Sequence, residues 1–106
     1  MQTPLISILV PFKNTESYIV ECLDSIVQQT YSHWELIIID DGSTDASYQL
    51  VQNYANSDAR IHLLRNTGNG IIEALRTGYK LAKGTFVTRM DSDDVMALNK
   101  LEQMQQ

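Results

Sequence analysis

Short apolar runs rich in β-branched residues alternate with stretches of helical periodicity, and this alternation constrains the fold more than any other feature. The strand-like runs cover 5–10, 34–39, 61–65 and 85–90, and the helical faces lie within 16–28, 46–55, 71–82 and 98–106. Strands of about six residues separated by longer helices predict right-handed crossovers. The sequence therefore predicts an α/β fold, with a mainly parallel sheet and helices on both faces.

Several residues are candidates to begin or end the predicted helices. Thr15 can cap the first helix and Ser43 or Thr44 the second, because a hydroxyl accepts a hydrogen bond from a free N–H of the first turn. Gly84 follows the third helix, where a left-handed residue is expected. The last helix is predicted to turn three apolar residues inward, namely Leu98, Leu101 and Met104.

Two acidic clusters follow two of the predicted strands. Residues 40–45 (Asp-Asp-Gly-Ser-Thr-Asp) follow the second strand, and residues 91–94 (Asp-Ser-Asp-Asp) follow the fourth. Ligands of open α/β sheets bind at the carboxyl ends of the strands, so both clusters are expected at one edge. Asp91 and Asp93 can reach one ion, whereas Asp94 is expected to point away. Carboxylates that repel one another gain from a shared hard cation, which predicts a Mg2+ or Mn2+ site for a phosphate ester.

These residues also have simpler interpretations. An Asx turn in which Asp93 or Asp94 caps the next helix would explain the second cluster without a metal. Arg89 can pair with these acids or with a phosphate. In the first cluster, Asp41 is the candidate to accept a hydrogen bond from a base N–H or a ribose hydroxyl. The turn at 68–70 (Gly-Asn-Gly) lacks a phosphate-loop pattern and is interpreted as an ordinary loop.

The composition argues against several classes of protein. With 106 residues the chain fits a single domain, and 13 acidic against 8 basic residues give a net charge of −5 that would repel nucleic acid. The single cysteine, Cys22, lies among apolar positions of a helix and is predicted to be a buried thiol. No apolar stretch reaches the ~20 residues that span a bilayer, and no signal-peptide pattern is present, so a cytoplasmic location is expected.

Three motifs, in this order, resemble the inverting family-two glycosyltransferases: Pro11-Phe12-Lys13-Asn14, the acidic cluster at 40–45, and Arg89-Met90-Asp91-Ser92-Asp93-Asp94. The resemblance covers nearly the whole chain and includes shorter pieces such as Gln29-Thr30-Tyr31 and Ala82-Lys83-Gly84. It implies the A-type nucleotide-diphospho-sugar transferase fold (GT-A, Rossmann-like), in which this half of the domain holds the donor, usually a UDP-sugar.

The resemblance also implies roles for individual residues. Asp41 would contact the base, Asp91 would lie near the ribose, and Asp93 would bind the metal on the diphosphate. Asp91 is the second candidate metal ligand. The pocket for the base would be lined by Pro11, Phe12 and Asn14.

The sequence departs from the family pattern at three places. Lys13 stands where a tyrosine is common, Leu75-Arg76 where many members carry Arg-Asn, and Leu98 where a proline usually follows the metal motif. A cationic side chain at either of the first two places could compensate by contacting phosphate. Arg76 is therefore a candidate nucleotide-binding residue.

The family mechanism implies that an acceptor hydroxyl displaces the nucleotide diphosphate in line, with inversion at the anomeric carbon and assistance from Mn2+ or Mg2+. The general base of this family lies in the acceptor-binding half, and no residue here is a convincing match. Residues 1–106 are thus expected to be the donor-binding part of a longer enzyme, with the acceptor-binding half and a base beyond Gln106 absent. The expected acceptors are glycans or lipid-linked molecules, which would suit membrane attachment through later segments.

Three other functions compete with this one. A receiver-type phosphoacceptor domain also holds Mg2+ with clustered acids, but it places its acid pair after the first strand, where this chain has Pro11-Phe12-Lys13-Asn14. A nucleotidyltransferase normally opens with a Gly-rich, basic loop, which is missing here. A non-catalytic nucleotide-binding module stays open as the main alternative, although the retained acids favour donor binding.

Overall fold

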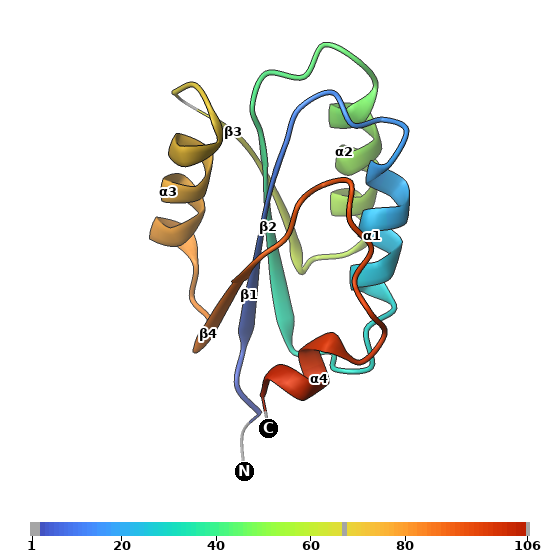
Figure 1. Cartoon of the computed structure of the whole chain (residues 1–106), viewed down its shortest axis with the longest axis vertical. Coiled ribbons are helices and arrows are strands. Elements are labelled where there is room, and N and C mark those ends of the chain that lie inside the picture. Colours follow the sequence, from blue (N-terminus) through green and yellow to red (C-terminus); the bar gives the residue numbers. More distant parts are fainter. Residues whose placement is uncertain (1–2, 67, 106) are drawn as a thin grey trace.

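In the computed structural model, which describes residues 3–66 and 68–105, strands and helices alternate along the chain as predicted (Figure 1). None of the helices in these two stretches is long and apolar enough to cross a bilayer. The elements, in chain order, are β1 (Ile6–Phe12), α1 (Ile19–Val27), β2 (Trp34–Asp40), α2 (Ser47–Ser57), β3 (Ile61–Arg65), α3 (Ile71–Leu81), β4 (Phe86–Arg89) and α4 (Lys100–Met104).

The strands form one parallel sheet in the order β3-β2-β1-β4. In the centre of the sheet, Leu9 of β1 pairs with Ile37 of β2 on one side and with Arg89 of β4 on the other. The chain moves outward from β1 to β3 and then returns to the opposite side of β1. The strand order therefore reverses between β1 and β4, which is where an open α/β sheet leaves a crevice for a ligand.

Helices cover both faces of the sheet, which confirms the predicted fold class (Figure 1). α1 and α2 pack on one face, around fully buried residues such as Ile8 and Leu23, and α3 packs on the other face. Gly78 lets α3 approach closely, because a Cβ at this position would lie 3.1 Å from Leu9 Cδ2. Every residue of β1 and β2 is buried, as expected for central strands covered on both faces.

The predicted helix caps are wrong. α1 has no side-chain cap at its N-cap residue Tyr18, and Thr15 supplies its carbonyl, which accepts the Tyr18 N–H at 2.9 Å. The N-cap residue of α2, Ala46, likewise provides no side-chain cap, and the Ser47 N–H donates to Asp45 Oδ1 at 2.9 Å. Ser43 Oγ accepts the N–H of Asn14 at 3.0 Å, and the Thr44 N–H donates to Asn14 Oδ1 at 2.7 Å. Ser43 and Thr44 therefore bond to the loop after β1 and do not cap α2.

The expectation of a left-handed residue at Gly84 is also wrong, since positive φ angles occur at Gly42 and Gly70 instead. Gly84 is needed for a different reason, its close approach to the start of β1. Its N–H donates to Ser7 Oγ at 2.8 Å, and a Cβ would lie 2.7 Å from the Ser7 backbone nitrogen and 2.8 Å from the Leu5 carbonyl oxygen.

The last helix is shorter than predicted and begins only at Lys100. Leu98 consequently precedes the helix and is 59% exposed, so its expected inward orientation is wrong. Leu101 is fully buried and Met104 packs against the same core, as predicted.

Gly84→Ala should destabilise the fold by about 1–3 kcal/mol, because the added methyl group would overlap backbone atoms that cannot move aside. A loss of that kind lowers the midpoint of thermal unfolding by roughly 4–8 °C per kcal/mol in a domain of this size, which circular dichroism would measure. Gly68→Ala is the matched control, since the nearest atom there is Glu73 Cγ at 3.2 Å, in a side chain that can move. Equal melting of the two variants would contradict this account.

Candidate functional site

A cleft of about 290 Å³ opens at the carboxyl ends of the central strands, and both acidic clusters border it. Its walls come from the end of β1, the loop after β2, the start of α3 and the turn after β4. The lining residues are Pro11, Phe12, Lys13, Thr15, Asp41, Ile71, Asp91, Ser92 and Asp93. The structure thus confirms that the two clusters meet at one edge of the sheet.

The cleft opens where Pro11 interrupts the pairing of β1 with β4. The Leu9 carbonyl accepts the Met90 N–H at 3.0 Å, so Leu9 faces β4. Alternate residues of a strand face opposite neighbours, and Pro11 therefore also faces β4, with no N–H to donate to it. Phe12 faces β2, and its carbonyl accepts the Asp41 N–H at 2.8 Å. β1 and β2 consequently stay paired up to the cleft, whereas the chain diverges from β1 after β4.

Asp91, Asp93 and Asp94 gather in the turn at 91–94, which we call the acidic turn. One carboxylate oxygen of each lies within 4.8 Å of the others, and all three side chains are exposed. The Asp94 N–H donates to the Asp91 carbonyl at 3.1 Å and closes the turn. The expectation that Asp94 points away from the other two is wrong, because this turn brings its carboxylate beside theirs. Three such oxygens repel one another and match the ligands that a hard divalent cation prefers.

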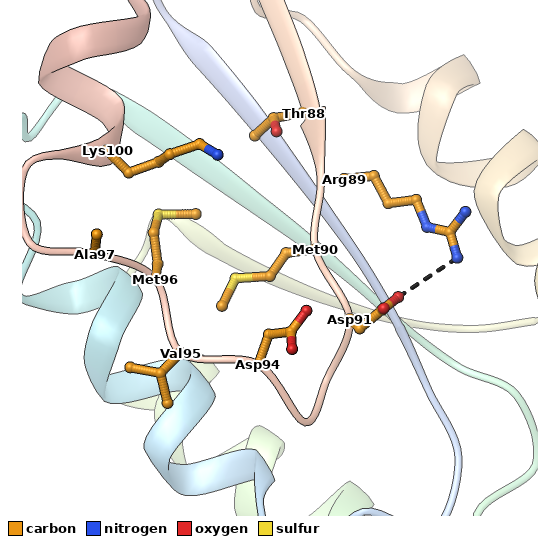
Figure 2. A pocket seen from close by; sticks show the side chains of 9 residues that line it. All are labelled: Thr88, Arg89, Met90, Asp91, Asp94, Val95, Met96, Ala97 and Lys100. Atoms are coloured by element: carbon orange, nitrogen blue, oxygen red, sulfur yellow. Dashed lines mark hydrogen bonds and ion pairs between the residues drawn. The ribbon is translucent and has the colours of Figure 1, made fainter.

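The side chain of Arg89 lies beside the acidic turn. Arg89 Nη2 is 3.4 Å from Asp91 Oδ1, and since both side chains are about half exposed this is a weak ion pair (Figure 2). A second pocket of about 540 Å³ lies here, with apolar walls such as Met90 and Met96 and with Lys100 at its rim. Asp91 borders this pocket as well as the cleft, so the two hollows meet at the acidic turn.

Cys22 lies beneath the acidic turn and is fully buried, as predicted. Its Sγ donates a weak hydrogen bond to the Asp91 carbonyl at 3.9 Å. Burial, helped by the negative charges of Asp94 and Asp93, raises the pKa of the Cys22 thiol to about 12. The sulfur therefore stays protonated at neutral pH and adds no charged ligand to the three carboxylates.

Two buried polar side chains, Ser25 in α1 and Gln29 just after that helix, hold the chain segment that follows the acidic turn. Ser25 Oγ accepts the Met96 N–H at 2.9 Å. Gln29 Nε2 donates to the Ala97 carbonyl at 2.6 Å, and its Oε1 accepts the Leu101 N–H at 3.1 Å. Figure 1 shows this segment running back along α1 toward α4. The sequence analysis named Gln29 only as part of the motif Gln29-Thr30-Tyr31. These hydrogen bonds explain why a glutamine is suited to that position.

Asp41 borders the cleft from the loop after β2, and one of its oxygens is already occupied. Asp41 Oδ1 accepts hydrogen bonds from Asn66 Nδ2 at 2.9 Å and from the Gly70 N–H at 3.0 Å. The Gly70 N–H is therefore directed at a carboxylate of the protein itself, which agrees with the interpretation of 68–70 as an ordinary loop. Asn66 was not identified from the sequence, and Thr67 lies outside the described residues.

Two of the predicted nucleotide-binding residues do not line the cleft. Asn14 has a φ of 53°, and its Oδ1 accepts the N–H groups of Thr44 at 2.7 Å and Asp45 at 3.2 Å, so it joins the loops after β1 and β2. Arg76 is exposed on α3 and pairs with Glu73 at 3.2 Å. The other predicted site residues all border the cleft, namely Pro11, Phe12, Asp41, Asp91 and Asp93.

Comparison with known proteins gives consistent matches along this chain. The family model described as glycosyl transferase family 2 matches residues 7–106. Among curated proteins, the chain is similar to the uncharacterized glycosyltransferase EpsJ of Bacillus subtilis (strain 168). The two share 42% identity over 94 residues, which is 89% of this chain and 27% of EpsJ.

Two solved structures are also similar. TarS from S. aureus, in complex with UDP, matches with a TM-score of 0.86 and 32% identity, covering 93% of this chain and 30% of TarS. The mannosyltransferase PcManGT from Pyrobaculum calidifontis, in complex with GDP-Man and Mn2+, matches with a TM-score of 0.80 and 29% identity, covering 89% of this chain and 29% of PcManGT. The chain spans less than a third of the length of each of these three proteins.

Gln29→Ala should lower the free energy of unfolding by about 1–3 kcal/mol, because it leaves the buried Leu101 N–H without an acceptor and frees the segment after the acidic turn. Unfolding in urea would measure this loss. Gln28→Ala is the matched control, since Gln28 is the exposed neighbour of Gln29. A change as small as that of the control would contradict the role of Gln29 in holding this segment.

Proposed function

This chain belongs to glycosyl transferase family 2, and we propose that residues 1–106 form the part of a longer enzyme that binds the nucleotide diphosphate sugar donor. Its architecture is the GT-A fold of its structural neighbours. The observation that carries the proposal is that Asp41 and the acidic turn border one cleft where the strand order reverses. One extended ligand in that cleft would have its base at Asp41 and its phosphates at the acidic turn.

The nucleotide is proposed to be a uridine diphosphate. Asp41 would accept a hydrogen bond from the base, Pro11 and Phe12 would line the base pocket, and Asp91 would lie near the ribose. Asn14 would shape the pocket by holding the loop after β2 against the loop after β1. The UDP bound in the complex of TarS supports this choice.

Asp91 and Asp93 are proposed to hold a divalent cation, Mn2+ or Mg2+, with Asp94 as a third oxygen donor within reach. The clustering of three exposed carboxylates supports this proposal, and so does the Mn2+ in the complex of PcManGT. When bound, the ion would neutralise negative charge that accumulates on the leaving diphosphate.

The reaction is proposed to be transfer with inversion, in which a hydroxyl of a glycan or of a lipid-linked acceptor displaces the nucleotide diphosphate at the anomeric carbon. Such a step needs a general base next to the acceptor hydroxyl. We propose that the base belongs to the acceptor-binding half of the longer enzyme, beyond Gln106. The residues described here would then bind and orient the donor, which is consistent with the greater length of the relatives.

Calorimetric titration of UDP into the chain should show saturable binding with Mn2+ and none with EDTA. Asp93→Asn should weaken this binding at least about tenfold, because it removes one of three anionic ligands while keeping the shape of the side chain. Glu21→Gln is the matched control, since Glu21 is an exposed acid on α1. Equal binding in the presence of Mn2+ and of EDTA would contradict the metal-assisted site.

Arg76→Ala should be tested in the same titration. Arg76 is a candidate to contact the phosphates of the donor because it is positively charged, although it does not line the cleft. A weaker affinity for UDP would support the contact. An unchanged affinity would remove Arg76 from the site.

The chain should bind the donor without transferring sugar at an appreciable rate, since it is proposed to lack the general base. Release of UDP from a UDP-sugar, followed in the presence of Mn2+ and an oligosaccharide acceptor, should stay close to the rate of the same mixture without protein. Robust metal-dependent turnover by residues 1–106 would contradict both the proposed division of the domain and the proposed position of the base.

A further inference from the structure

The two carboxylate oxygens of Asp41 are not equivalent. Oδ1 accepts two hydrogen bonds, from Asn66 Nδ2 at 2.9 Å and from the Gly70 N–H at 3.0 Å. A carboxylate oxygen has two lone pairs, so these donors fill the acceptor capacity of Oδ1. Within the described residues no donor reaches Oδ2, and Asp41 borders the cleft. Oδ2 is therefore the oxygen that remains for a ligand.

Asn66 is itself fixed in one orientation. Its backbone N–H donates to the Asp40 carbonyl at 2.8 Å, which anchors it at the end of β3 beside β2. Its Nδ2 donates both to Asp41 Oδ1 and to the Gly70 carbonyl, the latter at 3.1 Å, while its Oδ1 accepts the Gly68 N–H at 3.3 Å. Rotating the amide by 180° would bring its oxygen against two acceptors, so the donor side must face Asp41.

This arrangement distinguishes between nucleobases. Guanine presents two adjacent donors, a ring N–H and an amino group, and matches a carboxylate through both of its oxygens. Uracil presents a single ring N–H between two carbonyl oxygens, and one free carboxylate oxygen is enough to accept it. With Oδ1 already filled, Asp41 can accept the one ring N–H of uracil through Oδ2, whereas it can accept only one of the two adjacent donors of guanine.

We propose that Asn66 is a positioning residue that makes Asp41 selective for a base with one ring N–H, such as uracil, over guanine. The inference rests on the proposed donor-binding function. It adds Asn66, which the sequence analysis did not identify, to the site. It also selects one base, which similarity to known structures does not do, because TarS was solved with UDP and PcManGT with GDP-Man.

The test is a pair of titrations, UDP and GDP, each in the presence of Mn2+, on the parent chain and on variants. The parent chain should prefer UDP at least about tenfold. Asn66→Ala should weaken UDP binding roughly five- to tenfold and leave GDP binding within about twofold, because it frees Oδ1 for the second guanine donor. Asn66→Leu, which keeps the approximate size of the side chain and removes its donors without adding a charge beside Asp41, should also reduce the preference for UDP.

Asn69→Ala is the matched control, because Asn69 is exposed in the same loop, and it should keep the preference of the parent chain. The ratio of UDP to GDP affinity is the decisive quantity, since a merely structural role of Asn66 would weaken both ligands by the same factor. An equal loss for both nucleotides, or an unchanged ratio in folded Asn66→Ala and Asn66→Leu, would overturn the inference and leave the donor-binding proposal standing. A folded parent chain that binds neither nucleotide would overturn both.

Discussion

The arrangement of the site depends on β1, a fully buried strand that pairs in parallel with β2 on one side and with β4 on the other. Because both partners run in the same direction, the segments that follow them emerge at one edge of the sheet. Pro11 adds a second constraint, since it has no N–H to continue the bonding to β4 beyond the Met90 N–H. The cleft therefore results from the backbone pattern of one strand, and the acidic side chains are placed around it.

The loops at this edge are held by polar side chains that bond to backbone groups. Asn14 joins the loops after β1 and β2, and Gln29 secures the segment after the acidic turn. Asn66 joins the end of β3 to Asp41. These bonds fix the backbone without using the acids of the acidic turn, whose described contact with a cation is the weak one to Arg89. The carboxylates that repel one another thus stay available to a ligand.

The features that could be predicted from the sequence depend on residues that are close together in the chain. Alternating strand and helix periods are properties of neighbouring residues, and so is the position of an acid at the end of a strand, which is why the fold class and the meeting of Asp41 with Asp91 were predictable. The failures involve choices between local and distant partners. Ser43 can bond to its own helix or to Asn14, and only the packed loops decide in favour of Asn14.

The same reason explains the residues that were missed or misread. Gly84 suits a helix end in sequence, but its contact with Ser7 comes from a strand more than seventy residues earlier in the chain. Asn66 carries no signal in a loop until Asp41 lies beside it. Asp94 was expected to point away because an extended backbone alternates its side chains, whereas the hydrogen bond from its N–H to the Asp91 carbonyl makes a turn.

The exposure of the acidic turn has a consequence for how the proposed ion and donor would bind. Mg2+ takes an octahedral set of oxygens and loses its water reluctantly, and three carboxylates supply about half of such a set. Cys22 is fully buried below them, with its Sγ hydrogen-bonded to the Asp91 carbonyl. Diphosphate oxygens of a donor bound in the cleft, which Asp91 and Asp93 border, could supply the rest. Three exposed acids are thus better suited to bind a cation together with a diphosphate than to enclose the cation alone, and this favours a role in donor binding over that of a structural metal site.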